Sequence, residues 1–186
     1  ITGHTGFKGS WLSLWLLQMN AQVSGISLKP EDPNNLFDQL KIKKDLNHII
    51  CDIRDKDSLR KNIMSIKPEV IFHLAAQPLV VKSYIEPIST WETNVLGTLN
   101  VLNAMSSLEN KCSGIFITTD KVYKNNEWMY GYRENDELGG HDPYSSSKAA
   151  CELAISSWRS SFIDSKRNGS NLSIVSARAG NVIGGG

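Results

Sequence analysis

Short apolar segments alternate with helical segments along the whole chain, and this alternation constrains the fold more than any other feature. The pattern predicts strands at 22–27, 48–51, 70–75, 114–118 and 172–177. It predicts helices at 11–17, 59–66 and 87–107, and a further helix that begins near Tyr144. Strands separated by helices form a parallel sheet with right-handed crossovers and helices on both faces. The predicted fold class is therefore α/β, with a doubly wound parallel sheet.

A glycine-rich run, GHTGFKG from Gly3 to Gly9, comes directly before the first predicted helix. Glycines here let the backbone approach a pyrophosphate, which then lies against the positive end of the helix. The usual dinucleotide-binding turn has the spacing GxGxxG, so this run is a variant, and a plain glycine-rich turn is the alternative. Because the first glycine follows the stub of a strand, the run favours a Rossmann-type dinucleotide-binding fold.

Ligands of such sheets bind at the carboxyl ends of the strands, where the strand order reverses. We therefore expect four segments to surround one crevice. They are the glycine run, Ala75–Gln77, Thr118–Lys121 and Arg178–Asn181.

Tyr144 and Lys148 are four residues apart in the run YSSSK, directly after Pro143. Residues at this spacing lie one turn apart on the same face of a helix. An ammonium group beside a phenol favours the phenolate and lowers its pKa from about 10. The pair therefore predicts a base that accepts a proton from a substrate hydroxyl, although YxxxK also occurs on solvated helix faces.

Composition limits the other possibilities. The 186 residues, 40% hydrophobic and 21% charged, suit one globular domain with a substantial core. The net charge of +1 argues against nucleic acid or an anionic membrane as partner. Three widely spaced cysteines without a CxxC motif predict reduced thiols and a cytoplasmic protein, and no metal site is predicted. A start without methionine and a stop at three glycines predict a fragment of a larger protein.

Six motifs together resemble the extended short-chain dehydrogenase/reductase family, and within it the nucleotide-sugar 4,6-dehydratases. Members that act on CDP-glucose are the most similar. The motifs are GHTGFKGSWL (3–12), HLAAQPLV (73–80), TNVLGT (93–98), TTDKVY (118–123), GYRENDELGGHDPYSSSKAACE (131–152) and RAGNVIGGG (178–186). The resemblance implies a dinucleotide-binding domain over residues 1–186, with the sugar-nucleotide domain expected beyond residue 186.

The resemblance also implies NAD as cofactor and assigns residues to it. These are Gly3, Thr5, Gly6, Phe7, Gly9, Asp52, Ile53, Leu74, Ala75, Ala76, Asn94, Tyr144 and Lys148. Asp52 would lie along the adenine, unless it is a solvated turn residue, and Asn94 would help to hold a proton relay, unless it is a buried structural amide. Ser27, Leu28 and Lys29 stand where an acidic residue usually reads the ribose, so NADP stays open.

For the reaction, the resemblance implies that Tyr144 takes the proton of the sugar 4-hydroxyl while Lys148 tunes the phenol. A dehydratase also needs an acid at the 6-hydroxyl and a base at C5. In the catalytic segment Thr119, Asp120 and Lys121, Asp120 is the expected acid and Lys121 the expected base. Burial and the nearby Lys148 would keep Lys121 neutral. Substrate contacts are expected from Gln77 and Asn181, in a sugar pocket shaped by Trp128, Tyr130, Gly139, Gly140 and His141.

Other functions remain open at this stage. They are a dehydratase for UDP-N-acetylglucosamine or dTDP-glucose, an epimerase of the same family, and a catalytically silent NAD-sensing module. Relatives also pair the helices that begin at Pro87 and Tyr144 into a homodimer. Surplus apolar residues on these helices favour the same assembly here: Val95, Leu99, Leu102, Ala150, Ile155 and Phe162.

Overall fold

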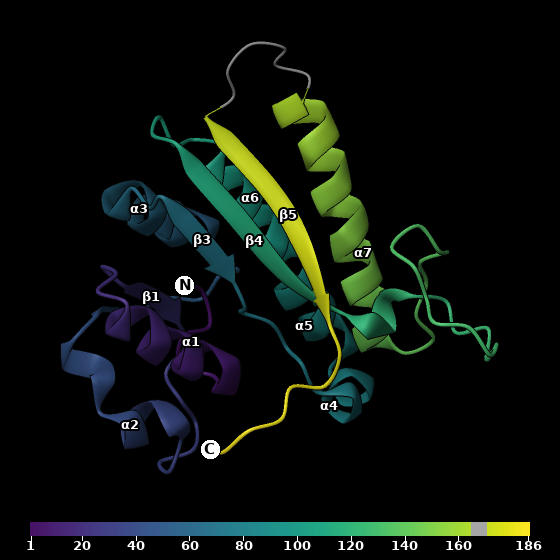
Figure 1. Ribbon diagram of the computed structural model, residues 1–186, viewed down its shortest axis with the longest axis horizontal. Helices are drawn as coiled ribbons and strands as arrows, with labels where there is room; N and C mark the ends of the chain where they lie inside the picture. Colours follow the sequence, from purple (N-terminus) through teal and green to yellow (C-terminus); the bar gives the residue numbers. More distant parts are fainter. Residues whose placement is uncertain (165–170) are drawn as a thin grey trace.

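The computed structural model describes residues 1–164 and 171–186 and contains one parallel sheet (Figure 1). Strand β1 (Ser24–Ser27) pairs with β2 (Asn47–Ile50), and β4 (Cys112–Thr119) lies between β3 (Val70–His73) and β5 (Leu172–Ala179). Thr2 joins the two groups, because it bridges Ile26 of β1 and His73 of β3 in parallel. The sheet order is therefore β2-β1-Thr2-β3-β4-β5. The predicted doubly wound α/β class is confirmed.

The strand order reverses at Thr2. From Thr2 the chain passes outward to β1 and β2, and then returns to build β3, β4 and β5 on the other side. Hydrogen bonds fix this junction: Thr2 N donates to Phe72 O (2.9 Å), and Gly3 N donates to Ile26 O (2.7 Å). Such a reversal opens a crevice at the carboxyl ends of the central strands. The glycine run starts at that point.

Seven α-helices are present in the described part of the chain. They are α1 (Phe7–Gln18), α2 (Leu36–Leu40), α3 (Lys56–Ile66), α4 (Val80–Ile85), α5 (Pro87–Trp91), α6 (Gly97–Met105) and α7 (Pro143–Trp158). An acidic residue caps the N-terminus of two of these helices. The Asp55 side chain accepts from Ser58 N at the start of α3, and Asp142 accepts from Ser145 N (3.0 Å) at the start of α7. These acidic caps satisfy backbone N–H groups that the first turn leaves free.

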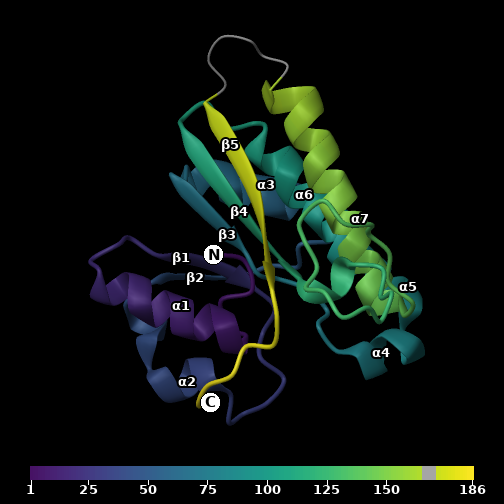
Figure 2. The ribbon, with the colours of Figure 1, turned by 45° about the vertical axis from the view of Figure 1, so that its right-hand side comes forward.

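Two apolar cores lie on opposite faces of the sheet (Figure 2). On one face α3, α6 and α7 pack over the sheet, and on the other face α1 and α2 cover β1. The larger core contains Leu59, Val101, Leu102, Met105, Phe116 and Ile155. The smaller core gathers around Phe37 and Ile42. Helices on both faces hold the sheet rigid, so the strand ends that form the crevice are well supported.

The predicted helix over 87–107 is divided. A π-helical turn at Glu92–Leu96 separates α5 from α6, and the helix ends at Met105. The strand predicted over 70–75 ends at His73. Helices α2 and α4 were not predicted, because five or six residues are too few to show a helical repeat. Within the described ranges, no helix is long and apolar enough to cross a membrane. All three cysteines are buried free thiols.

Candidate active site

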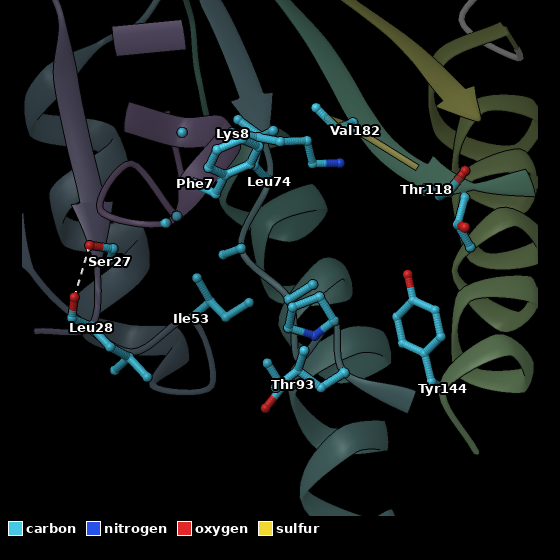
Figure 3. Close-up of a pocket in the computed structure, with 18 of the residues that line it drawn as sticks. Phe7, Lys8, Ser27, Leu28, Ile53, Leu74, Thr93, Thr118, Tyr144 and Val182 are labelled. Carbon is cyan, nitrogen blue, oxygen red and sulfur yellow. Dashed lines mark hydrogen bonds between the residues drawn. The ribbon is translucent and has the colours of Figure 1, made fainter. Parts of the chain in front are cut away.

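A cleft of about 700 Å³ opens at the carboxyl ends of the strands, beside the point where their order reverses (Figure 3). It brings together most of the segments expected from the sequence. Predicted cofactor residues that line it are Gly3, Thr5, Gly6, Phe7, Gly9, Asp52, Ile53, Leu74, Ala75, Ala76 and Tyr144. Thr119, Lys121 and Asn181 line the same cleft, whereas Gln77, Asn94, Asp120 and Lys148 are not among its lining residues.

The glycine run forms a tight turn under one end of the cleft. Gly3 has φ +74°, and Gly6 N donates to Gly3 O (3.1 Å) just before α1 begins. A Cβ atom on Gly9 would lie 2.1 Å from Gly3 O, and one on Gly3 would lie 2.8 Å from Ala75 N. Both neighbours are backbone atoms that cannot move aside. Only glycine therefore fits at these two positions, and the exposed Gly6 presents its backbone at the N-terminus of α1, which suits a pyrophosphate.

The end of β1 supplies neutral polar groups to the cleft. The hydroxyls of Thr5 and Ser27 are 2.8 Å apart, and both donate to Leu28 O, at 3.1 and 3.0 Å. Lys29 is not among the residues that line the cleft. A charged pair lies farther along, where Arg54 Nη2 donates to Asp52 Oδ2 (2.6 Å). The hydrogen bonds from Arg54 lower the pKa of Asp52.

Tyr144 and Lys148 are both buried on α7, with 9% and 7% of their surface exposed. The phenol of Tyr144 points into the cleft near Thr118 (Figure 3). Burial raises the pKa of Tyr144, and a hydrogen bond with Thr119 lowers it by a smaller amount. The expected lowering by Lys148 is therefore wrong for this structure, because loss of solvation is the larger effect. Burial also lowers the pKa of Lys148, whose Nζ donates to Ile117 O (3.4 Å).

Asp120 and Lys121 lie in a 3₁₀ turn, Asp120–Val122, that follows β4. Lys121 Nζ is 3.4 Å from Asp120 Oδ1 and 3.3 Å from Asn181 Oδ1. The side chain of Lys121 is 45% exposed and that of Asp120 is 56% exposed. The expected burial of Lys121 is therefore wrong, because the turn carries its side chain to the rim of the cleft. The amine of Lys148, in contrast, lies in the interior, where it donates to the backbone carbonyl of Ile117 in β4.

A second cavity of about 490 Å³ lies on the other side of this turn. Asp120 and Lys121 contribute to it, together with Gly139, Gly140 and His141. Trp128 and Tyr130 line neither of these two cavities, and their side chains are exposed. The loop residues expected around the sugar are thus divided, with only 139–141 beside the Asp120–Lys121 turn.

Two predicted site residues act inside the protein. Asn94 Oδ1 accepts from Gln77 N (2.8 Å), and Asn94 Nδ2 donates to Ser147 Oγ (2.9 Å). The amide of Gln77 bonds to Leu79 and Thr90. Both amides have their hydrogen-bonding groups occupied beneath the cleft. We therefore expect Asn94 and Gln77 to support the wall of the cleft.

Lys8 is a cleft residue that sequence reasoning missed. Its amine points across the cleft toward the side where Thr118 and Tyr144 lie (Figure 3). Burial lowers the pKa of Lys8. Its position inside the glycine run was a usable signal, because Lys8 lies two residues after Gly6, in the first turn of α1.

A parallel sheet with a glycine turn, and a YxxxK tyrosine in the same cleft, defines a Rossmann-type α/β fold of the short-chain dehydrogenase/reductase type. More narrowly, the model of the GDP-mannose 4,6 dehydratase family matches residues 1–178, and the chain belongs to that family. The family-level prediction is confirmed.

Similar proteins fall within the same group. The chain is 48% identical to the CDP-glucose 4,6-dehydratase of Salmonella typhimurium, over 100% of this chain and 52% of the relative. It is 31% identical to the CDP-paratose 2-epimerase of Salmonella typhi, over 82% of this chain and 50% of the relative. The crystal structure of the Thermus thermophilus UDP-glucose 4-epimerase with NAD matches with a TM-score of 0.78 and 26% identity, covering 95% and 53% of the two chains. The chain spans about half the length of these relatives.

Proposed function

We propose that the protein is an NAD-dependent CDP-glucose 4,6-dehydratase, a lyase that forms CDP-4-keto-6-deoxyglucose. The observation that carries this proposal is that Tyr144, Thr119 and Lys121 line one cleft, with Asp120 Oδ1 3.4 Å from the Lys121 amine. An epimerase needs the tyrosine alone, whereas loss of water across C5 and C6 needs an additional acid and base. The 48% identity to a CDP-glucose 4,6-dehydratase supports the choice of substrate.

The cofactor assignment rests on the glycine turn, where a Cβ on Gly3 or Gly9 would collide with backbone. Gly3, Gly6 and Gly9 would hold the pyrophosphate, and Asp52 and Ile53 would lie beside the adenine. When bound, NAD supplies the hydride acceptor for C4 and the hydride donor for C6. We propose NAD over NADP because Thr5, Ser27 and Leu28 form a neutral cluster at the end of β1, and Arg54 is already paired with Asp52.

Each protein group has a distinct proton to move. The phenolate form of Tyr144 accepts the proton of the 4-hydroxyl, and Lys148 holds positive charge behind it. Lys121 removes the proton at C5, and Asp120 protonates the departing 6-hydroxyl. Lys121 can act as a base only as the neutral amine. Because its side chain is exposed in this structure, a bound hexose must cover it and so disfavour the charged form. Asn181 is 3.3 Å from the Lys121 amine and would hold it toward the sugar.

The test is to incubate the protein at its natural full length with CDP-glucose, UDP-N-acetylglucosamine, dTDP-glucose and GDP-mannose. We expect a 4-keto-6-deoxy product from CDP-glucose. The same product from another nucleotide sugar would reassign the substrate, and a C4 epimer without loss of water would make the protein an epimerase. Binding of NAD without any product would identify a silent sensing module.

We also propose a homodimer in the cytoplasm. The predicted set of surplus apolar residues is wrong in part, because Leu102 and Ile155 belong to the core. Helices α5 and α7 nevertheless pack together, and the surface around them carries exposed apolar side chains, among them Phe162 of the predicted set. These are Ile88 (70% exposed), Leu96 (53%), Leu153 (62%) and Phe162 (51%). An isologous contact would bury them. The three free cysteines support a reducing compartment.

A further inference from the structure

A buried ion pair joins α7 to β5 behind the cleft. Glu152 is 5% exposed and lies one helical turn after Lys148 on α7. Its Oε2 accepts from Arg178 Nη2 (3.0 Å) and from Ser176 Oγ (2.9 Å), both on β5. Its Oε1 accepts a short hydrogen bond from Thr118 Oγ1. Burial raises the pKa of Glu152, but the hydrogen bonds from Arg178, Thr118 and Ser176 outweigh burial, so its pKa lies below the ordinary value.

Arg178 extends the connection to the far side of the Asp120–Lys121 turn. Its Nη1 donates to Tyr123 Oη (2.9 Å) and to Glu134 O (3.0 Å). The guanidinium also lies 4.9 Å from the centre of the Tyr123 ring, within the range of a cation–π contact. Tyr123 directly follows the turn, and Thr118 lies two residues before it. The Glu152–Arg178 pair therefore holds the chain on both sides of the proposed acid and base.

The side chains of Asp120 and Lys121 make only a few contacts near the surface. Thr119 Oγ1 donates to Asp120 Oδ1 (3.0 Å), and Lys121 Nζ lies 3.3 Å from Asn181 Oδ1. Both side chains are about half exposed, and the contact between Nζ and Oδ1 is 3.4 Å long. Exposed ion pairs of this kind hold a geometry only weakly. Helix α7, in contrast, carries Tyr144, Lys148 and Glu152 on one rigid element. The distance between the tyrosine and the turn therefore depends on the hydrogen bond between Tyr144 and Thr119, and on the bonds that Glu152 and Arg178 make to the flanking residues.

We propose that Glu152 and Arg178 are positioning residues, which hold the Asp120–Lys121 turn in register with Tyr144 and so set the rate of water elimination without touching the substrate. This proposal rests on the proposed dehydratase function. C4 oxidation uses Tyr144 and Lys148, which α7 carries, so a displaced turn should slow it less than it slows elimination. Elimination requires that Lys121 and Asp120 reach C5 and the 6-hydroxyl together, and a misplacement of about 1 Å can cost about 100-fold in rate.

The experiment is a single turnover of CDP-glucose by the full-length protein carrying Glu152→Gln. Glutamine keeps the shape of the side chain and removes the charge that Arg178 pairs with. We expect C4 oxidation close to the wild-type rate and elimination slower by about 100-fold. Bound NADH should accumulate and be visible in its near-ultraviolet absorbance. Without any ligand, the amides of residues 119–123 should exchange with solvent faster than in the wild type.

Two further variants guard the interpretation. Tyr123→Phe keeps the ring beneath the guanidinium but removes the hydroxyl, and should slow elimination in the same direction by a smaller factor. Glu137→Gln removes an exposed ion pair with Lys124 (3.1 Å) from the same loop, and should change neither step. If Glu152→Gln fails to fold, Tyr123→Phe decides. Equal slowing of both steps, or no accumulation of NADH, overturns the positioning role alone, whereas a wild type that makes no 4-keto-6-deoxy product overturns the dehydratase function as well.

Discussion

Asn94 and Ser147 are joined by a hydrogen bond of 2.9 Å, which ties the π-helical turn to the helix that carries Tyr144 and Lys148. The other groups of the Asn94 amide bond to the backbone of Gln77, at 2.8 and 3.2 Å. One buried side chain therefore connects three segments beneath the cleft. The backbone carbonyl of Asn94 also accepts hydrogen bonds, from Thr98 Oγ1 (2.6 Å) and from Cys151 Sγ (3.0 Å).

The first prediction concerns this connection. Ser147→Ala removes the acceptor of the Asn94 amide in a site that solvent does not reach. We expect the free energy of unfolding to fall by about 1–3 kcal/mol, the usual cost of a buried polar group left without its partner. Ser156→Ala, at an exposed position of the same helix, is the control and should change stability by less than about 0.5 kcal/mol. Equal urea midpoints for the two variants would contradict the structural role of this bond.

The second prediction tests the glycine turn. Gly9→Ala places a Cβ 2.1 Å from Gly3 O and 2.7 Å from His4 Cα, so the turn itself must move. We expect NAD binding, measured by calorimetric titration, to be lost. Gly131→Ala is a matched control, because nothing lies within 4 Å of its Cβ position. If Gly9→Ala binds NAD as tightly as Gly131→Ala does, the pyrophosphate site is elsewhere.

Much of the fold could be predicted because parallel strands buried on both faces are short apolar runs, and turns with capping residues separate them. The glycine run was equally legible, since the backbone conformation at Gly3 excludes larger residues. The division of the 87–107 helix was not predictable. At this division the backbone carbonyl of Asn94 accepts from Thr98 Oγ1 and Cys151 Sγ, and Cys151 lies on α7, far away in the sequence.

Many of the residues that line the cleft were predictable from the sequence, although Lys8 was missed, and the electrostatics of the site were less predictable. Spacing placed Tyr144 and Lys148 on one helix face, but the pKa of the tyrosine depends on how deeply the fold buries it. The exposure of Lys121 depends on the direction in which the 3₁₀ turn leaves β4, and no local pattern encodes that direction. The assigned roles of these residues stay predictions.

The third prediction concerns acid stability. His73 is buried between Thr2 Oγ1 (2.7 Å) and Thr98 Oγ1 (3.0 Å). Burial, with a smaller effect of the Lys148 charge, lowers its pKa from 6.5 to about 3. Between these values the unfolded chain binds a proton that the folded chain does not bind. The contribution of His73 to the free energy of unfolding is therefore fully present above pH 6.5. It is lost as the pH falls toward about 3, by about 1.4 kcal/mol per pH unit.

His73→Gln tests this prediction by urea denaturation over the same pH range. The variant should be less stable at neutral pH, because its amide cannot reproduce both bonds, and its stability should depend less on pH. His4, whose pKa burial lowers to about 4, contributes a loss of the same sign and remains in both proteins. Parallel curves for the wild type and His73→Gln would show that another group carries the pH dependence.

The fourth prediction concerns assembly. Leu153 is 62% exposed on α7, so a charge there costs little in a monomer and much in a buried dimer contact. We expect Leu153→Glu to convert the full-length protein from dimer to monomer in sedimentation experiments. Met129→Glu adds the same charge at a loop position that is 99% exposed, and should leave the assembly unchanged. A wild type that sediments as a monomer at every concentration would exclude the proposed dimer.

The last prediction separates the two chemical steps. Tyr144→Phe removes the group that accepts the 4-hydroxyl proton, so neither step should proceed and bound NAD should stay oxidised. Lys121→Met leaves Tyr144 and Lys148 in place but removes the proposed base at C5. Bound NADH should then accumulate in a single turnover, together with a 4-keto hexose that keeps its 6-hydroxyl. A general base contributes about 100- to 10,000-fold, so the block should be large.

The loss of the Lys121 side chain has a second effect, which applies before a bound hexose covers this position. Asp120 then lacks its partner at 3.4 Å, and its negative charge raises the pKa of Tyr144. The pH profile of C4 oxidation in Lys121→Met should therefore shift to higher pH, while its rate at alkaline pH stays near the wild-type rate. Solvent deuterium should not enter C5 at any pH. If Lys121→Met still forms product and exchanges C5 at the wild-type rate, another residue is the base, and the exposed position of Lys121 reflects a role at the rim of the cleft.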